Sequence, residues 1–131
     1  MKIKLLFLTT VMAGVSACNK VTVDDYYGQY DMTDDCRNAY TITIREASTD
    51  NHVMIDNFMN RLDYSEASVD GKTISFTDEE VWSIDVGTGT QVRYTVTANG
   101  TFKKGEIEWS YHYELDDNSL SENCTATAEK R

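Results

Sequence analysis

The sequence predicts an all-β protein, an eight-stranded antiparallel up-and-down β-barrel. Three observations lead to this fold class. Apolar and polar residues alternate with period two in many stretches, no long stretch has helical periodicity, and Gly, Asn and Asp must form the turns because proline is absent. Eight short strands joined in sequence close into a barrel more readily than they stay open, because closure removes the exposed edges of the sheet.

The first residues predict an export signal. Lys2 and Lys4 precede and interrupt an apolar run that is too short to span a bilayer as a helix. The run ends at Val15-Ser16-Ala17-Cys18, which resembles a bacterial lipobox with Val15 in place of the preferred leucine. The resemblance implies that residues 1–17 are removed, that Cys18 receives lipid, and that residues 18–27 form a tether to the bilayer. The alternative is a soluble secreted protein with an odd thiol at Cys18.

Residues 28–131 are predicted to form the barrel domain. The clearest strand is 106–115, where apolar and mostly aromatic residues alternate with polar ones, as expected of a strand with one buried and one solvated face. The same alternation predicts the other strands at 28–34, 40–45, 52–58, 65–69, 72–77, 91–98 and 121–129. Asn99-Gly100 is interpreted as a bulge in a strand that continues past residue 98. A short helical turn fits 58–62.

The predicted connections alternate in length. Those at 47–51, 70–71 and 103–105 are short, whereas those at 34–39, 57–64, 78–90 and 116–120 are longer. In an up-and-down meander the two sets lie at opposite ends, so one end has tight turns and the other long loops. Within the third long connection, Val81-Trp82-Ser83-Ile84 alternatively extends the preceding strand.

Cysteine placement supports closure of the barrel. Cys36 follows the first predicted strand and Cys124 lies near the start of the last one, so the two meet at one rim if these strands are neighbours. In an oxidising compartment an isolated pair of cysteines most simply forms a disulfide. We therefore expect a bond between Cys36 and Cys124 that locks the barrel closed.

Charge and motifs exclude several classes of function. The chain carries 22 acidic against 12 basic residues, and loss of the leader makes it more acidic, so the surface repels nucleic acids. There is no phosphate loop, no nucleophile elbow, no Cys-x-x-Cys and no His-Glu-x-x-His motif. The sequence therefore predicts a non-enzyme without catalytic residues, a metal or a cofactor. An acid-catalysing hydrolase, using loop carboxylates, is the least supported alternative.

The long-loop end holds the candidate binding residues. Its loops contain acidic clusters and an aromatic residue suited to stacking on a glycan or gripping a partner. The predicted rim site comprises Asp34, Asp35, Asn57, Phe58, Trp82, Asp116 and Asp117. The opposite end should face the membrane and be basic, since it carries Lys72, Lys103 and Lys104. Calcium binding at the acidic clusters is less favoured than simple solvation, because no loop has the spacing of a known calcium loop.

Two resemblances bear on fold and location. Gly28-Gln29-Tyr30 resembles the Gly-x-Trp opening of lipocalins, which implies that Tyr30 packs across the closed end of the barrel. The chain is also similar to small Bacteroides-type envelope lipoproteins, through the Gly-x-Tyr opening, Ile55-Asp56-Asn57-Phe58 and Cys124-Thr125-Ala126-Thr127. This similarity implies a lipid-anchored envelope protein, at the outer membrane, and implies no particular activity.

Two functions remain open at this point. The first is binding of a small apolar or glycan ligand at the long-loop end. The second is a protein–protein module, either an accessory subunit or an inhibitor, that uses the acidic rim loops. An interior cavity of a few hundred Å³ favours the first, and a barrel filled by its aromatic side chains favours the second. The aromatic inventory is compatible with both.

Overall fold

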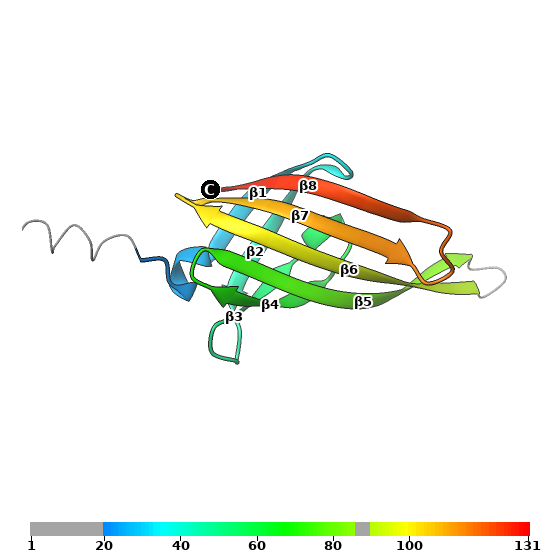
Figure 1. The fold of residues 1–131 in the computed structure, drawn as a ribbon, viewed down its shortest axis with the longest axis horizontal. Helices are drawn as coiled ribbons and strands as arrows, with labels where there is room; N and C mark the ends of the chain where they lie inside the picture. The colour runs from blue at the N-terminus through cyan, green and yellow to red at the C-terminus, as the bar shows by residue number, and fades with distance from the viewer. Residues whose placement is uncertain (1–19, 86–89) are drawn as a thin grey trace, which may run out of the picture.

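The chain folds into one closed barrel of eight antiparallel strands (Figure 1). The computed structural model describes residues 20–85 and 90–131, and of residues 81–85 and 90–92 the backbone alone. The strands are β1 (Gly28–Asp34), β2 (Asn38–Glu46), β3 (His52–Asp56), β4 (Tyr64–Asp70), β5 (Thr73–Asp85), β6 (Thr90–Lys103), β7 (Glu106–Leu115) and β8 (Ser121–Lys130). Two short 3-10 helices accompany them, η1 (Val23–Tyr26) and η2 (Phe58–Asn60). No helix in the described part of the chain is both long and apolar enough to cross a membrane.

The predicted strand order is confirmed. Each strand pairs with its neighbours in sequence, and β1 pairs with β8, so that Met32 lies opposite Ala128. Turns at Gly71 and at Lys104-Gly105 therefore lie at one end, next to η1 and the C-terminus, and the β7–β8 connection lies at the other (Figure 1). We call these the tether end and the far end.

β5 and β6 extend furthest beyond their predicted bounds. β5 continues to Asp85, so the alternative in which residues 81–84 extend the strand is correct. The paired ends of β5 and β6 form a ribbon at the far end of the barrel (Figure 1). The register shift in this pair lies between Ser83 and Asp85.

The predicted bulge at Asn99-Gly100 is wrong. The β5–β6 and β6–β7 registers run through both residues without a shift. A Cβ atom at Gly100 would lie 3.0 Å from Cε3 of Trp109 and 2.9 Å from Cγ2 of both Ile74 and Ile107. The glycine is therefore explained by packing, because it leaves room for the buried indole on the next strand.

Aromatic residues close the tether end. Tyr26 of η1 is buried, packs against Phe102 with 4.8 Å between ring centroids, and donates a hydrogen bond to the carbonyl of Gly71. Burial, assisted by the charge of Asp25, raises the pKa of Tyr26 to about 12, so this hydroxyl remains a donor at neutral pH. Tyr30 is also buried and donates to the carbonyl of Tyr26. The packed unit thus begins at η1, within the segment that was expected to be tether.

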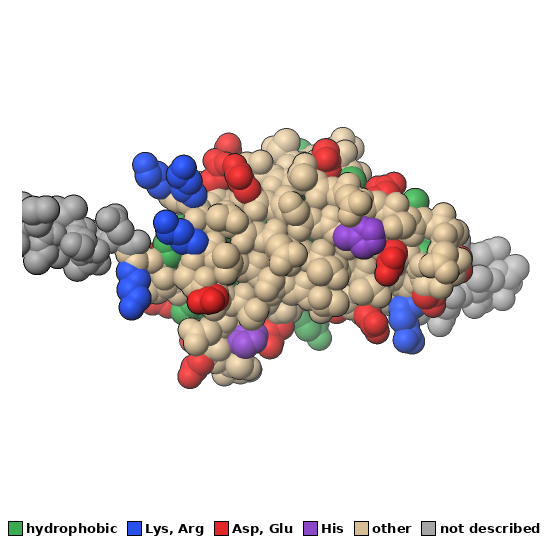
Figure 2. Space-filling view, viewed as in Figure 1, with side chains coloured by type: hydrophobic (Ala, Val, Ile, Leu, Met, Phe, Trp, Pro, Cys, Tyr) green, Lys and Arg blue, Asp and Glu red, His purple; other side chains and the backbone are tan. Residues whose placement is uncertain are grey.

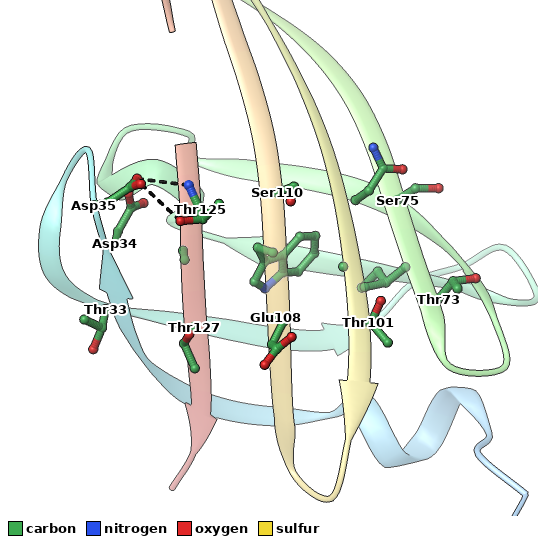
Figure 3. Close-up of a pocket in the computed structure, with 15 residues that line it drawn as sticks. Thr33, Asp34, Asp35, Thr73, Ser75, Thr101, Glu108, Ser110, Thr125 and Thr127 are labelled. Atoms are coloured by element: carbon green, nitrogen blue, oxygen red, sulfur yellow. Dashed lines mark hydrogen bonds between the residues drawn. The ribbon is translucent and has the colours of Figure 1, made fainter. Parts of the chain in front are cut away.

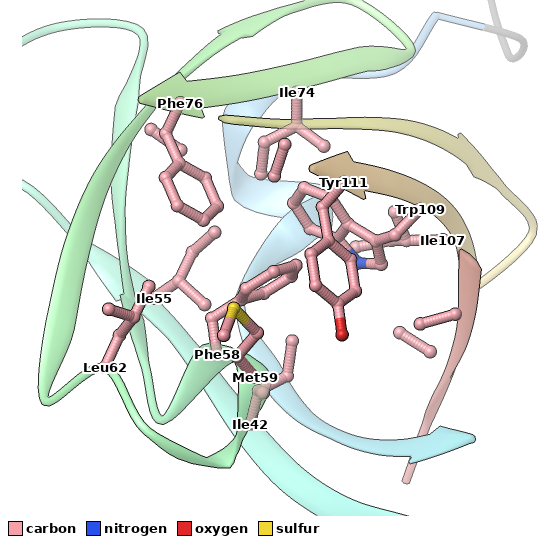
Figure 4. Close-up of a cluster of buried hydrophobic side chains, with 14 of the residues drawn as sticks. Ile42, Ile55, Phe58, Met59, Leu62, Ile74, Phe76, Ile107, Trp109 and Tyr111 are labelled. Atoms are coloured by element: carbon pink, nitrogen blue, oxygen red, sulfur yellow. The ribbon is translucent and has the colours of Figure 1, made fainter. Parts of the chain in front are cut away.

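The middle of the barrel is filled by side chains. Phe58 projects inward from η2, and its ring lies 5.1 Å from that of Phe76, 4.9 Å from that of Trp109 and 5.3 Å from that of Tyr111 (Figure 4). These edge-to-face contacts suit aromatic quadrupoles. Met59 and Leu62 are buried beside them. The segment 58–62, for which a helical turn was predicted, therefore fills the interior of the barrel. We call this segment the plug.

Charge is distributed unevenly between the ends. Figure 2 shows Lys and Arg side chains at the tether end. The strand order places Lys72, Lys103 and Lys104 there as predicted, but also the carboxylates Asp70 and Glu106. The tether end is therefore mixed in charge rather than basic. The far end carries the acidic excess, although arginines are present there too.

Candidate functional site

The structure corrects the placement of Asp34 and Phe58. Both were expected at an accessible rim, but Asp34 is only 4% exposed and Phe58 is fully buried. Asp34 continues the inward alternation of Tyr30 and Met32 along β1, and Phe58 belongs to the plug. Neither side chain is available to a partner or ligand at the surface.

Asp34 organises a buried polar cluster. Its Oδ2 accepts hydrogen bonds from the hydroxyls of Tyr111 (2.7 Å) and Tyr40 (2.8 Å), and its Oδ1 accepts from the backbone N–H of Cys36 (2.8 Å). The Tyr40 hydroxyl in turn accepts from the backbone N–H of Met59 in the plug. Burial, the hydrogen bond to Asp34 and its charge all raise the pKa of Tyr40 and Tyr111. The cluster joins β1, β2, β7 and the plug.

Asp35 and the disulfide fasten β1 to β8. The predicted bond between Cys36 and Cys124 is present, with 5.9 Å between the Cα atoms. Asp35 accepts hydrogen bonds from the backbone N–H (2.9 Å) and the hydroxyl (3.0 Å) of Thr125, and its own N–H donates to the Thr125 carbonyl. The carboxylate and the two sulfur atoms lie within 4.8 Å of one another, but the sulfurs are bonded to each other. This group is structural.

The structure describes three of the remaining rim residues in full, Asn57, Asp116 and Asp117, and the backbone of Trp82. Asp116 and Asp117 are exposed in the β7–β8 turn, where hydrogen bonds from the side chain and the backbone N–H of Ser119 lower the pKa of Asp117. Asn57 has a left-handed backbone and donates from its side chain to the Thr41 carbonyl, so it holds the plug in place. At Trp82 the backbone pairs with Val92 in the β5–β6 ribbon, and its side chain lies outside the description.

A hollow on the outer wall was not predicted. It has a volume of about 710 Å³ and crosses the outside of β5, β6, β7, β8 and β1 (Figure 3). Two smaller hollows of about 280 and 320 Å³ share Asn99 with it. We call the hollow of about 710 Å³ the wall hollow. Its volume falls within the range of small-molecule sites.

The wall hollow is lined by small polar side chains in two rows. Strand register places Thr73, Thr101, Glu108, Thr127 and Thr33 in one row, and Ser75, Asn99, Ser110 and Thr125 in the next. They face outward because their neighbours along each strand, such as Ile74 and Trp109, are buried. The lining contains three carboxylate residues, the buried Asp34 and the exposed Asp35 and Glu108, and no lysine or arginine. Figure 2 shows this face as largely free of charged and apolar side chains.

Many of these groups are available for new hydrogen bonds. Within the described residues, Asn99, Thr101 and Ser110 make no side-chain hydrogen bond. They lie on β6 and β7, the strands at the middle of the wall hollow. Period-two alternation placed Ser110 on the polar face of its strand, whereas Asn99 was interpreted as part of a bulge. Only strand register shows that five strands bring these side chains into two rows.

An arginine at the far end was also missed. Arg37, next to Cys36 in the β1–β2 connection, places its Cζ atom 5.0 Å from the ring centroid of Tyr113. Its Nε atom is buried and has no hydrogen-bond partner within the described residues. The Nε1 atom of Trp109, in the core, is likewise buried without a hydrogen-bond partner within the described residues. A lone arginine in a loop gives no signal in the sequence, because its stacking on β7 depends on closure of the barrel.

Comparison of the chain with protein-family models and with curated proteins finds no match to either.

Proposed function

We propose that this protein is a non-enzymatic binding module of the bacterial envelope that holds an uncharged glycan chain in the wall hollow. Lipid on Cys18 would anchor it to the membrane, most simply the outer membrane. The observation that carries the proposal is the hollow of about 710 Å³ whose lining is rich in hydroxyl and amide groups and contains no cation.

The chemistry of the lining fits sugars. Ser and Thr hydroxyls and the Asn amide both donate and accept, as sugar hydroxyls do. The Glu108 carboxylate, exposed in the first row, accepts hydrogen bonds from sugar hydroxyls. Because no lysine or arginine lines the hollow, an anionic polymer has no counter-charge there. The extent of the two rows over five strands favours a chain of several sugars over a single one.

The filled core argues against an apolar ligand inside the barrel. The rings of Phe58, Phe76 and Trp109 occupy the middle of the interior, and aromatic residues close the tether end. A ligand inside would have to displace buried aromatic side chains, each of which stabilises the fold by several kcal/mol, on the order of 3–5. A ligand on the outer wall displaces only solvent.

Replacing Ser110 by lysine should weaken glycan binding. The long charged side chain would fill the middle of the hollow and leave sugar hydroxyls unpaired. We expect binding of neutral oligosaccharides of four to six units, tested as cello-, malto-, manno- and xylo-series by calorimetry, to weaken about tenfold or more, or 1.4 kcal/mol. Thr43→Lys, an outward position on β2 away from the hollow, is the matched control and should bind normally.

Two results would contradict this proposal. One is that none of the four series binds the unmodified protein. The other is that Ser110→Lys and Thr43→Lys bind equally well.

The filled barrel also supports a second candidate, the protein–protein module. Asp116 and Asp117 are exposed at the far end, away from the tether, and would attract a basic partner. Neutralising both residues would weaken capture of such a partner and leave oligosaccharide binding unchanged, which separates the two candidates.

The anchor has its own test. Cys18 lies outside the described residues, and it is the one cysteine that does not take part in the disulfide. Replacing it with alanine should remove the only acyl acceptor, so that a clickable fatty acid fed to expressing bacteria no longer labels the protein. Label that persists in Cys18→Ala would show that the lipoprotein assignment is mistaken.

A further inference from the structure

The Arg37 guanidinium lies in an unusual position for a cation. It stacks on the face of Tyr113, with Cζ 5.0 Å from the ring centroid, and the side chain as a whole is half-buried. The Nε–H is buried and lacks an acceptor within the described residues. A buried donor left without an acceptor costs about 1–3 kcal/mol, more when the group is charged. An acceptor from outside the chain would recover that energy.

Other arginines in the same protein show what this edge binds. Arg45 donates from Nε and Nη2 to the two carboxylate oxygens of Asp56, at 2.9 and 3.1 Å. Arg131 donates from Nε to Asp31 at 2.7 Å. In both, the Nε edge faces a carboxylate, which is the group that matches the planar fork of the guanidinium.

Two carboxylates that are hydrogen-bonded to tyrosines near Arg37 are already engaged. Glu122 accepts a hydrogen bond from the hydroxyl of Tyr113 at 2.8 Å. Tyr113 is the residue on whose ring Arg37 stacks. Asp34 accepts hydrogen bonds from the hydroxyls of Tyr40 and Tyr111. Within the described residues no ion pair joins either carboxylate to Arg37. The guanidinium therefore keeps its charge available at the far end.

Charges of both signs lie at this end of the barrel. Burial, and then the charge of Arg37, lower the pKa of Arg61. Burial and the carboxylates Asp78 and Asp63 raise the pKa of Glu80 at the same end of the barrel. The Nε edge of Arg37, which has no acceptor within the described residues, matches a single carboxylate, as in the two arginine–carboxylate pairs above. The ligand must also be small, because the Nε–H is covered and becomes accessible only when the side chain turns to another rotamer.

We propose that Arg37 is the anchor of a second binding site, at the far end of the barrel, for a small organic monocarboxylate. Its carboxylate oxygens accept hydrogen bonds from Nε and one Nη, in the side-on arrangement that Arg45 makes with Asp56. Arg37 does not line the wall hollow, so failure of one proposed site would not contradict the other.

Arginine Nε–H resonances test this site directly. Sodium acetate, propionate and benzoate are titrated into 15N-arginine-labelled protein at constant ionic strength, with sodium chloride and sodium phosphate as comparisons. We expect the Nε–H resonance that is missing from Arg37→Lys to shift and saturate with the carboxylates and not with chloride. The lysine variant keeps the charge and loses the fork, so calorimetry with the same carboxylates should show at least a tenfold loss of affinity.

Arg93→Lys is the matched control, because Arg93 is an exposed arginine at the same end, on β6. Its carboxylate affinity should equal that of the unmodified protein. Ser110→Lys should also retain carboxylate binding, which separates this site from the glycan proposal. The inference is overturned if no Arg37 resonance saturates, if Arg37→Lys and Arg93→Lys bind carboxylates equally, or if phosphate saturates the resonance at lower concentration than the carboxylates.

Discussion

Replacing Cys36 and Cys124 together with alanine should lower the free energy of unfolding by about 4–5 kcal/mol, because the bond closes a long loop in the unfolded chain. The two residues are 88 apart in sequence, which makes the lost chain entropy large. The bond also lies at the junction of the first and last strands, where closure of the barrel depends on long-range pairing. A stability loss of this size approaches the whole stability of many small domains.

Urea unfolding of the double variant, in protein that also carries Cys18→Ser, measures this loss. Reducing the disulfide in protein with Cys18→Ser alone is the matched control and should give a similar change. The hydrogen bonds between Asp35 and Thr125 remain in both cases. A loss below about 1 kcal/mol would contradict this prediction, because it would mean that the disulfide hardly restricts the unfolded chain.

Replacing Asp34 with alanine should cost about 3–5 kcal/mol, because each buried donor left without its acceptor costs about 1–3 kcal/mol. The change leaves the hydroxyls of Tyr40 and Tyr111 and the N–H of Cys36 without their acceptor. It also weakens the support of the plug, because the Tyr40 hydroxyl accepts from Met59. We therefore expect increased exposure of the aromatic core as well as lower stability.

Asp35→Ala is the matched control for Asp34→Ala. Asp35 is exposed and accepts two hydrogen bonds from Thr125, so its loss should cost about 0.5–1.5 kcal/mol per bond at most. Denaturant unfolding and near-ultraviolet circular dichroism of both variants measure stability and aromatic packing. Equal losses in the two variants would contradict the role assigned to the buried cluster.

Much of the barrel could be predicted because its signals are local. Alternation in the run Ile107, Trp109, Tyr111 reports directly which side of a strand is buried. The positions of Cys36 and Cys124 relative to the strand ends then predicted closure. The long β5 could be recognised only as an alternative, since Trp82 and Ile84 share the phase of Phe76 but lie among turn-forming residues.

The site residues were harder to predict because their positions depend on tertiary structure. Asp34 is two residues from Met32 and four from Tyr30, so the alternation along the strand indicated an inward side chain. An aspartate at a strand end is normally solvated, however, and this made the inward position hard to predict. Phe58 enters the core through left-handed backbone at Asn57 and Met59, which the pattern of residues does not reveal. The wall hollow depends on register across five strands, which no single segment determines.

The central claim is that the protein recognises its ligand on the outer wall, with the interior filled. Amide chemical-shift mapping with the best-binding neutral oligosaccharide tests it most directly. The account predicts shifts centred on Ser75, Asn99, Ser110 and Thr125, with Asp116 and Asp117 unaffected. Shifts centred on Phe58, Tyr111 and the far-end loops, with the wall unchanged, would contradict it.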